Sequence, residues 1–200
     1  MLLEKGVTQS EIDANLTITQ GNVLNVEDCR NVLTRNGRTV DIIISGVGTL
    51  PTFSQMTICA NAVKNILSAL RTLRPTKKPL FVAISSTGIT TTGPRDVPLL
   101  MAPLYYVMLA NPHKDKKNME DAIIEHAEST ESAISGYVLI RPTLLTNGNA
   151  QGGQKVKVGT DAKPEIGYTI RRNDVGRWMF ENLLQSDGSK YSGQKLSFTY

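Results

Sequence analysis

Short apolar runs rich in β-branched residues alternate with longer amphipathic stretches along most of the chain. Residues 40–48 (VDIIISGVG) and 79–87 (PLFVAISST) are nearly continuous apolar runs and fit strands buried on both faces. Between them, apolar residues recur at spacings of three and four, which places them on one face of a helix. This face consists of Met56, Cys59, Ala60, Val63, Ile66, Leu67 and Leu70. The alternation is typical of βαβ units and predicts a parallel sheet.

The remaining predicted elements extend this alternation toward both ends of the sequence. We expect strands at 16–21, 136–145 and 195–200 and helices at 25–33 and 115–129. The strand at 195–200 reads KLSFTY, in which apolar and polar residues alternate. The elements together predict an α/β fold in which helices cover both faces of a parallel sheet.

Capping residues mark two of the helix starts. Asn25 precedes a helix that carries Glu27 and Asp28 in its first turn, where the helix dipole favours negative charge. Asn173 or Asp174 is placed to cap a final helix. The apolar face of that helix consists of Val175, Met179, Phe180 and Leu183.

Composition narrows the class of protein. The chain has 200 residues, 40% of them hydrophobic, so one sizeable core and a single domain over 1–200 are expected. The formal net charge is +4, but basic residues are scattered and aromatics make up only 6%, so we expect no nucleic-acid surface. Cys29 and Cys59 fall in predicted helices without a Cys-x-x-Cys motif, which predicts reduced packing residues and no metal site.

The sequence also contains no run near the roughly 18 apolar residues of a membrane helix. Its first residues, MLLEKGVTQSEID, do not have the pattern of a signal peptide. We therefore expect a soluble cytoplasmic protein with no membrane partner.

Small or polar residues follow four successive predicted strands. These segments are 21–23, 45–48, 85–88 and 142–143. Ligands of open parallel sheets bind beyond the carboxyl ends of the strands, and small residues let a ligand approach the backbone closely. Ordinary turns use the same residue types, so any single segment has two interpretations. The repetition at four ends favours a ligand site.

In the order of its motifs, the chain resembles the atypical short-chain dehydrogenases/reductases, the group of NAD(P)H-binding and NmrA-like proteins. The resemblance runs from LTITQGNVLNVED through VDIIISGVG, VAISST, DKKNMEDAI and YVLIRPTLLTNG to YTIRRNDVGRWMFENLL and KLSFTY. Each motif is weak alone, but their order and spacing are fairly specific. The resemblance implies a three-layer Rossmann-like parallel sheet and an oxidoreductase that uses NADP or NAD, with NADP favoured.

The resemblance implies that five residues bind the adenosine half of the cofactor. Asn22 and Val23 occupy the Gly-Asp-Val position that contacts adenine. Asn22 replaces the usual aspartate, which keeps a carbonyl acceptor and loses the charge. Ser45, Gly46 and Val47 would line the ribose and phosphate side.

The same resemblance places other residues around the nicotinamide. Ser85 and Ser86 match the serine that faces the nicotinamide and the substrate. Pro142, Thr143 and Leu144 match the segment whose backbone meets the carboxamide. A small-molecule substrate held over Ser85 and Ser86 would receive the hydride.

Catalysis in this family commonly pairs a tyrosine with a lysine four residues later. Here the lysine is present without the tyrosine. If Lys116 is the match, as Glu120 four residues on suggests, Pro112 holds the tyrosine position; if Lys117 is the match, His113 holds it. His113 is a candidate proton donor near pH 7. Both lysines would also suit an ordinary solvated helix face.

Tyr105 and Tyr106 lie upstream, in the apolar segment 97–110. The segment is interpreted as a substrate-side loop, which suggests an apolar ligand, and either tyrosine could reach the site. Packing against the core is the alternative interpretation for both. Atypical members of the family often transfer hydride without the tyrosine, so the absence of this residue does not exclude a reductase.

The family's first strand and its Gly-x-x-Gly-x-x-Gly loop, which binds the pyrophosphate at a helix start, have no match in this sequence. We expect the first strand, this loop and the second strand to lie before Met1. The strand at 16–20 must then pair with 40–46, leave the sheet or join another chain, and an exposed sheet edge would favour a homo-oligomer. Two alternatives to the enzyme follow: a catalytically inactive dinucleotide sensor or protein-interaction module, and a truncated product that no longer binds the cofactor.

Overall fold

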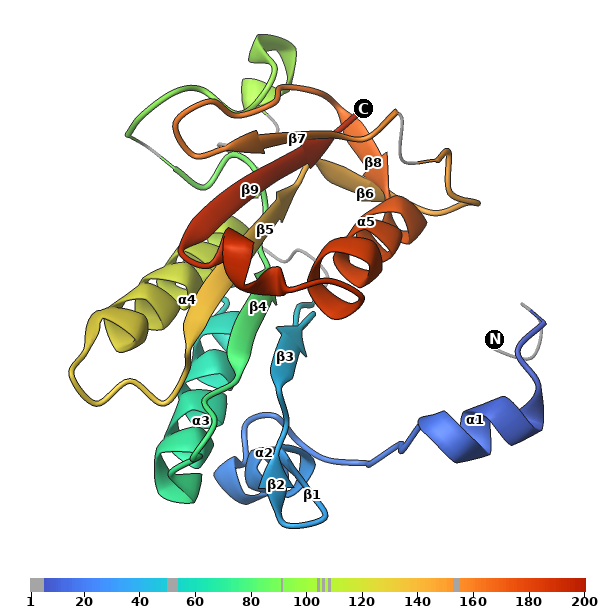
Figure 1. Ribbon diagram of the computed structural model, residues 1–200. Coiled ribbons are helices and arrows are strands. Elements are labelled where there is room, and N and C mark those ends of the chain that lie inside the picture. Colours follow the sequence, from blue (N-terminus) through green and yellow to red (C-terminus); the bar gives the residue numbers. More distant parts are fainter. Residues whose placement is uncertain are drawn as a thin grey trace.

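Helices cover both faces of a central sheet in the computed structural model (Figure 1). The structure describes residues 6–49, 54–90, 92–103, 105, 107, 109–152 and 155–200. The predicted three-layer α/β class is confirmed, and the differences from the prediction lie at the sheet edges and at the element boundaries.

The central sheet has the strand order β3-β4-β5-β9-β7. Its strands are β3 (Ile42–Ser45), β4 (Leu80–Ile84), β5 (Gly136–Pro142), β9 (Gln194–Thr199) and β7 (Lys157–Thr160). The first four are parallel, whereas β7 pairs antiparallel with β9 and makes the sheet mixed. Ser45 lies opposite Ala83, and Ile84 lies opposite Ile140. The carboxyl ends of β3, β4 and β5 therefore meet at one edge.

Alternating strand residues enter two separate hydrophobic cores. Phe81 and Ala83 of β4 pack against α2 (Val26–Val32), α3 (Ile58–Leu73) and α4 (Ala110–Glu128). Leu80 and Val82 face α5 (Arg172–Met179) and the π-helical turn η5 (Phe180–Leu184) that continues it. Burial on both faces explains why the sequence of β4 is continuously apolar.

Shorter elements complete the fold. They are α1 (Gln9–Asn15), β1 (Thr34–Arg35), β2 (Arg38–Thr39), η2 (Leu99–Met101), β6 (Leu144–Thr146), β8 (Thr169–Arg171) and η6 (Gly188–Tyr191). β1 and β2 form a hairpin, and its turn residues Asn36 and Gly37 both have positive φ, as a tight primed turn requires. β6 pairs in parallel with β8. No helix in the described ranges is long and apolar enough to cross a membrane.

The strand predicted at 16–21 is not formed. These residues lie outside the sheet (Figure 1). Ile18 is 83% exposed. Of the three alternatives for this segment, namely pairing with 40–46, leaving the sheet or joining another chain, the structure shows the second. β3 consequently has only β4 beside it within the described residues, and Ile44 is 40% exposed. The prediction that residues 40–48 are buried on both faces is wrong for this reason.

Several element boundaries also differ from prediction. α4 begins at Ala110, five residues before the predicted start, because proline is tolerated in a first helical turn and Pro112 occupies one. The predicted strand at 136–145 is divided, since β5 ends at Pro142 and β6 begins at Leu144. β9 does not alternate, because it lies between β5 and β7 and residues 196–199 are all buried.

Two predictions about helix caps have opposite outcomes. Asn25 caps α2, and its side chain accepts from the N–H groups of Glu27 and Asp28. The predicted cap of the last helix is wrong, because Arg171 is the N-cap of α5 and both Asn173 and Asp174 lie inside its first turn.

The cysteines are as predicted: Cys29 and Cys59 are both buried and free.

Candidate functional site

Lys116 of α4 lies over the shared carboxyl end of β3 and β4. Its Nζ donates hydrogen bonds to the carbonyl oxygens of Val47, at 3.0 Å, and Ile84, at 2.6 Å. Lys117 instead pairs with Asp121 on the outer side of the same helix. The structure thus brings the first of the two candidate lysines to the strand ends and leaves the second near solvent.

Asp115, the residue before Lys116, fixes the start of α3. Its carboxylate is fully buried and accepts from the N–H groups of Cys59, at 2.9 Å, and Ala60, at 3.0 Å. Thr57, the N-cap residue of α3, provides no capping hydrogen bond of its own. A carboxylate from α4 therefore satisfies the donors and the positive dipole end of α3.

Two buried serine hydroxyls lie at the same strand ends. Ser45 ends β3 and Ser85 follows β4, and both are buried. Within the described part of the chain, neither Oγ has a hydrogen-bond partner. A buried hydroxyl without a partner costs about 1–3 kcal/mol, so such groups are usually found where a ligand or water supplies one. Ser86 is half-buried, and its hydroxyl donates to the carbonyl of Thr87 at 2.9 Å.

The residues predicted to bind adenosine line one cavity. It has a volume of about 280 Å³ and lies between the segment after residue 18 and the end of β3. Its lining includes Asn22, Val23, Ser45, Gly46 and Val47 together with the apolar residues Val32, Leu33, Ile43, Ile44 and Ile66. The structure therefore brings this predicted group together in a cavity with a largely apolar lining, as is common for small-molecule sites.

Asn22 uses its carbonyl within its own loop. Asn22 Oδ1 accepts from the N–H of Leu24 at 2.9 Å, and the backbone N–H of Asn22 donates to the Asp28 carboxylate at 2.8 Å. Asparagine side chains commonly stabilise turns in this way. The side-chain carbonyl thus shapes the loop, although the sequence suggested that it would be an acceptor for adenine.

The segment after β5 is tightly held. The carbonyl oxygen of Pro142 accepts from the N–H of Thr87 at 3.1 Å, and the N–H of Thr143 donates to the carbonyl of Phe198 at 2.9 Å. Leu144 is exposed. Pro142 and Thr143 are therefore fixed beside the end of β4, and the backbone groups that the resemblance directs at the carboxamide are used within the protein. Leu144 is accessible to a ligand.

His113 is buried against Tyr105, whose ring centroid is 5.3 Å away. Burial lowers the pKa of His113 to about 4, although a hydrogen bond with the backbone of Gly88 opposes this shift. The imidazole is therefore neutral near pH 7, which does not favour the expected role as a protonated donor. Burial also raises the pKa of the Tyr105 phenol. Tyr106 lies outside the described residues.

The cofactor's pyrophosphate finds less support than its two nucleosides. The N-terminus of α3 follows β3, but Asp115 occupies its N–H groups. Gly48 leaves open space around its backbone, with no atom within 4 Å of a Cβ built there. Within the described residues, the start of α3 is therefore not free to bind the phosphates of a dinucleotide. The described residues also contain no group of three or more His, Cys, Asp or Glu residues that could hold a metal ion.

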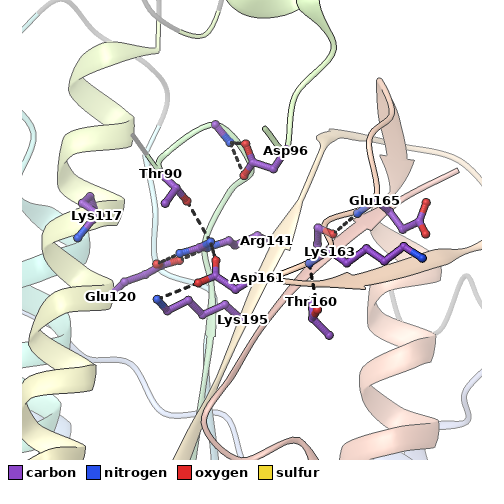
Figure 2. Close-up of polar contacts among 12 residues, drawn as sticks. Thr90, Asp96, Lys117, Glu120, Arg141, Thr160, Asp161, Lys163, Glu165 and Lys195 are labelled. Carbon is purple, nitrogen blue, oxygen red and sulfur yellow. Dashed lines mark hydrogen bonds and ion pairs between the residues drawn. The ribbon is translucent and has the colours of Figure 1, made fainter. Parts of the chain in front are cut away.

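Buried Arg141 of β5 is at the centre of a polar cluster that was not predicted from the sequence (Figure 2). Its Nε and one terminal nitrogen donate to the two carboxylate oxygens of Glu120 at 2.9 and 2.6 Å. Its other terminal nitrogen donates to Thr90, at 3.1 Å, and Asp161, at 2.7 Å. Lys195 also contacts Asp161. An arginine inside the apolar run YVLIRP was the available signal, because a buried cation requires a partner.

The fold and the strand-end site together define a Rossmann-type dinucleotide-binding protein. Residues 4–186 match the NAD(P)H-binding family model, and the chain belongs to that family. The resemblance inferred from the motifs is thereby confirmed.

Known relatives agree with this assignment. The chain is 40% identical over 221 residues to reductase pytE of Aspergillus terreus, an alignment that covers the whole chain and 83% of the relative. It is 28% identical over 239 residues to oxidase pynE of Aspergillus niger, covering the whole chain and 84% of that protein. The protein is thus an oxidoreductase-like member of a family that binds a nicotinamide cofactor.

The fold is also that of solved short-chain dehydrogenases/reductases. A wide-type member from Veillonella parvula, solved in complex with NADP, aligns with a TM-score of 0.66 at 13% sequence identity. The alignment covers 99% of this chain and 79% of that protein.

Proposed function

We propose that residues 1–200 form one NAD(P)-binding domain that reduces a small, apolar organic molecule by hydride transfer. The observation that carries this proposal is the position of Lys116 on the carbonyls of Val47 and Ile84, beside the unpartnered hydroxyls of Ser45 and Ser85. Donors and acceptors converge there at the edge where open parallel sheets bind ligands.

Each end of the dinucleotide has a place in this proposal. The adenine ring packs in the cavity beside Val23 and Ile44, and Ser45 Oγ gains a partner from the adenosine ribose. Lys116 and Ser85 hold the second ribose and the carboxamide beside Pro142. We favour NADP over NAD because the Veillonella parvula relative was solved with NADP.

The reduced nicotinamide supplies a hydride from its C4. Ser86 lies next to Ser85 and orients the substrate with its hydroxyl. Leu99, Leu100 and Val107, in the segment after β4, are all more than 70% exposed. Exposed apolar side chains on the segment that follows β4 support an apolar substrate.

A dinucleotide sensor without turnover is the second candidate. One observation favours it: the neutral His113 is poorly suited to protonate a product. A sensor would bind the cofactor at the same strand ends but would not consume it.

Titration of the purified chain with NADPH and NADH, following nicotinamide fluorescence and melting temperature together, tests the proposal. We expect micromolar binding, tighter for NADPH, and a raised melting temperature, because a ligand that binds only the native state stabilises it. Lys116→Met should weaken binding at least tenfold, and Lys117→Met on the same helix is the matched control that should not. A cooperatively folded chain that responds to neither cofactor would overturn both candidates. Binding without turnover across a panel of apolar carbonyl compounds would favour the sensor.

A further inference from the structure

Polar side chains hold the half of α4 nearest the strand ends against the rest of the fold. His113, Asp115 and Glu120 are buried on its inner face. His113 packs against Tyr105, and the first buried apolar side chain of the helix is that of Met119. Apolar packing tolerates small shifts between helices and sheets, whereas charge-assisted hydrogen bonds have narrow distances and directions. The position of this half of the helix is therefore set by a few directional contacts.

One of these contacts is the Glu120–Arg141 ion pair. The Glu120 side chain is 1% exposed and that of Arg141 is 5% exposed, and two parallel hydrogen bonds join them. Figure 2 shows the guanidinium surrounded by Glu120, Thr90 and Asp161, with a dashed contact to each. Such a bidentate pair fixes both the distance and the orientation of its partners.

The Glu120–Arg141 pair lies close to Lys116 in the fold because of where its two residues stand in the sequence. Glu120 lies one helical turn after Lys116, and Arg141 directly precedes Pro142 at the end of β5. The pair thus ties the helical turn that carries Lys116 to the end of the neighbouring strand. Asp115, on the other side of Lys116, ties the same turn to the start of α3. Lys116 is consequently held between two buried anchors.

We propose that Glu120 and Arg141 are positioning residues that keep Lys116 Nζ on the carbonyls of Val47 and Ile84. The functional half of this inference, that the positioned ammonium strengthens dinucleotide binding, rests on the proposed function. The positional half concerns the protein without ligand and is tested separately.

The decisive variant is the double substitution Glu120→Met with Arg141→Met. Replacing a buried ion pair by apolar side chains of similar volume is often neutral or stabilising, so this variant retains the fold but lacks the directional contact between Glu120 and Arg141. The matched control is Arg177→Met with Glu181→Met, which removes an exposed pair of α5 and η5. Melting temperature and circular dichroism verify that both variants are folded.

The first readout is the rate at which an acylating reagent modifies Lys116, measured by peptide mass spectrometry. Lys114 and Lys117 on the same helix are internal references. In the parent chain, Lys116 should react more slowly than these references, because its ammonium is held by two carbonyls. In the double Met variant it should react at least threefold faster, with Lys114 and Lys117 unchanged. Unchanged reactivity of Lys116 in a folded double variant would overturn the positional half.

The second readout is the NADPH affinity of the same proteins. The double Met variant should bind about tenfold more weakly than the parent, and the Arg177/Glu181 control should bind as the parent does. Equal affinity in all three, with Lys116 released in the double variant, would overturn the functional half. A parent chain that binds no NADPH would overturn the proposed function, and the acylation rates would still decide whether the pair positions Lys116.

Discussion

Buried His113 should make the stability of the protein depend on pH in a way that one substitution removes. The ring is 9% exposed, and burial lowers its pKa from 6.5 to about 4. In the unfolded chain, the same imidazole titrates near 6.5. Between these values the unfolded state binds more protons than the folded state, so the free energy of unfolding must fall as the pH is lowered.

The magnitude follows from the two pKa values. A pKa difference of one unit corresponds to about 1.4 kcal/mol, so the full shift is worth about 3 kcal/mol. Of this, about 2 kcal/mol should be lost between pH 7 and pH 5, before most carboxylates titrate. His126, the other histidine, is also buried, and its burial, with Arg71 and Lys78 nearby, lowers its pKa, so it adds to the same trend.

Urea unfolding at pH 7 and pH 5, followed by the fluorescence of the single tryptophan, Trp178, measures this loss. The parent should lose about 2 kcal/mol more than His113→Gln between the two pH values, whatever the variant's stability at pH 7. His126→Gln is the control that separates the second histidine. If His113→Gln and the parent lose the same amount, the ring is not neutral and buried as described, and the reasoning fails.

The remaining predictions concern packing at two glycines and the charge of one buried carboxylate. Gly176→Ala should raise the free energy of unfolding by about 0.5–1 kcal/mol, because α5 gains helix propensity and nothing lies within 4 Å of the new Cβ. Gly167→Ala should lower the free energy of unfolding by about 1–3 kcal/mol, because its Cβ would lie 1.9 Å from Thr199 Oγ1. Equal melting temperatures for the Gly176 and Gly167 variants would contradict both glycine predictions. Burial alone would raise the pKa of the Asp174 carboxyl. Hydrogen bonds from Tyr200 and from two loop N–H groups lower this pKa by more than burial raises it, so the net pKa is below its usual value. Asp174→Asn should therefore cost about 1–3 kcal/mol at pH 7, measured by urea unfolding, and the difference should shrink below about pH 4 as the parent protonates; a constant difference would show that the charge is unimportant.

Local signals in the sequence predicted local structure well. The spacing of Cys59, Val63, Ile66 and Leu70 identified the buried face of α3, and Asn25 caps α2 as expected. The strand predicted at 16–21 was wrong, although its residues have strand propensity. Pairing depends on a neighbour elsewhere in the chain, which propensity does not report. The Asn36-Gly37 turn was a readable hairpin signal that the sequence analysis overlooked.

The candidate site was predictable to a similar degree. The strand-end segments could be found because each follows its own strand, and five predicted residues do line one cavity. Asp115 could not be found in this way, since its partners lie 55 and 56 positions away. The choice between Lys116 and Lys117 was available from helical spacing. Lys116 lies three positions before Met119 and seven before Ile123, which puts it on the inner face.

The Glu120–Arg141 pair also limits how this protein can evolve. Substituting Arg141 alone leaves the Glu120 carboxylate buried without a partner, at a cost of about 3–5 kcal/mol. A typical domain has only about 5–15 kcal/mol of stability, so this intermediate would be close to unfolding. Substituting Glu120 first leaves Arg141 paired with Asp161. The two positions are therefore not equivalent in evolution, and descendants that lose both charges should lose Glu120 first.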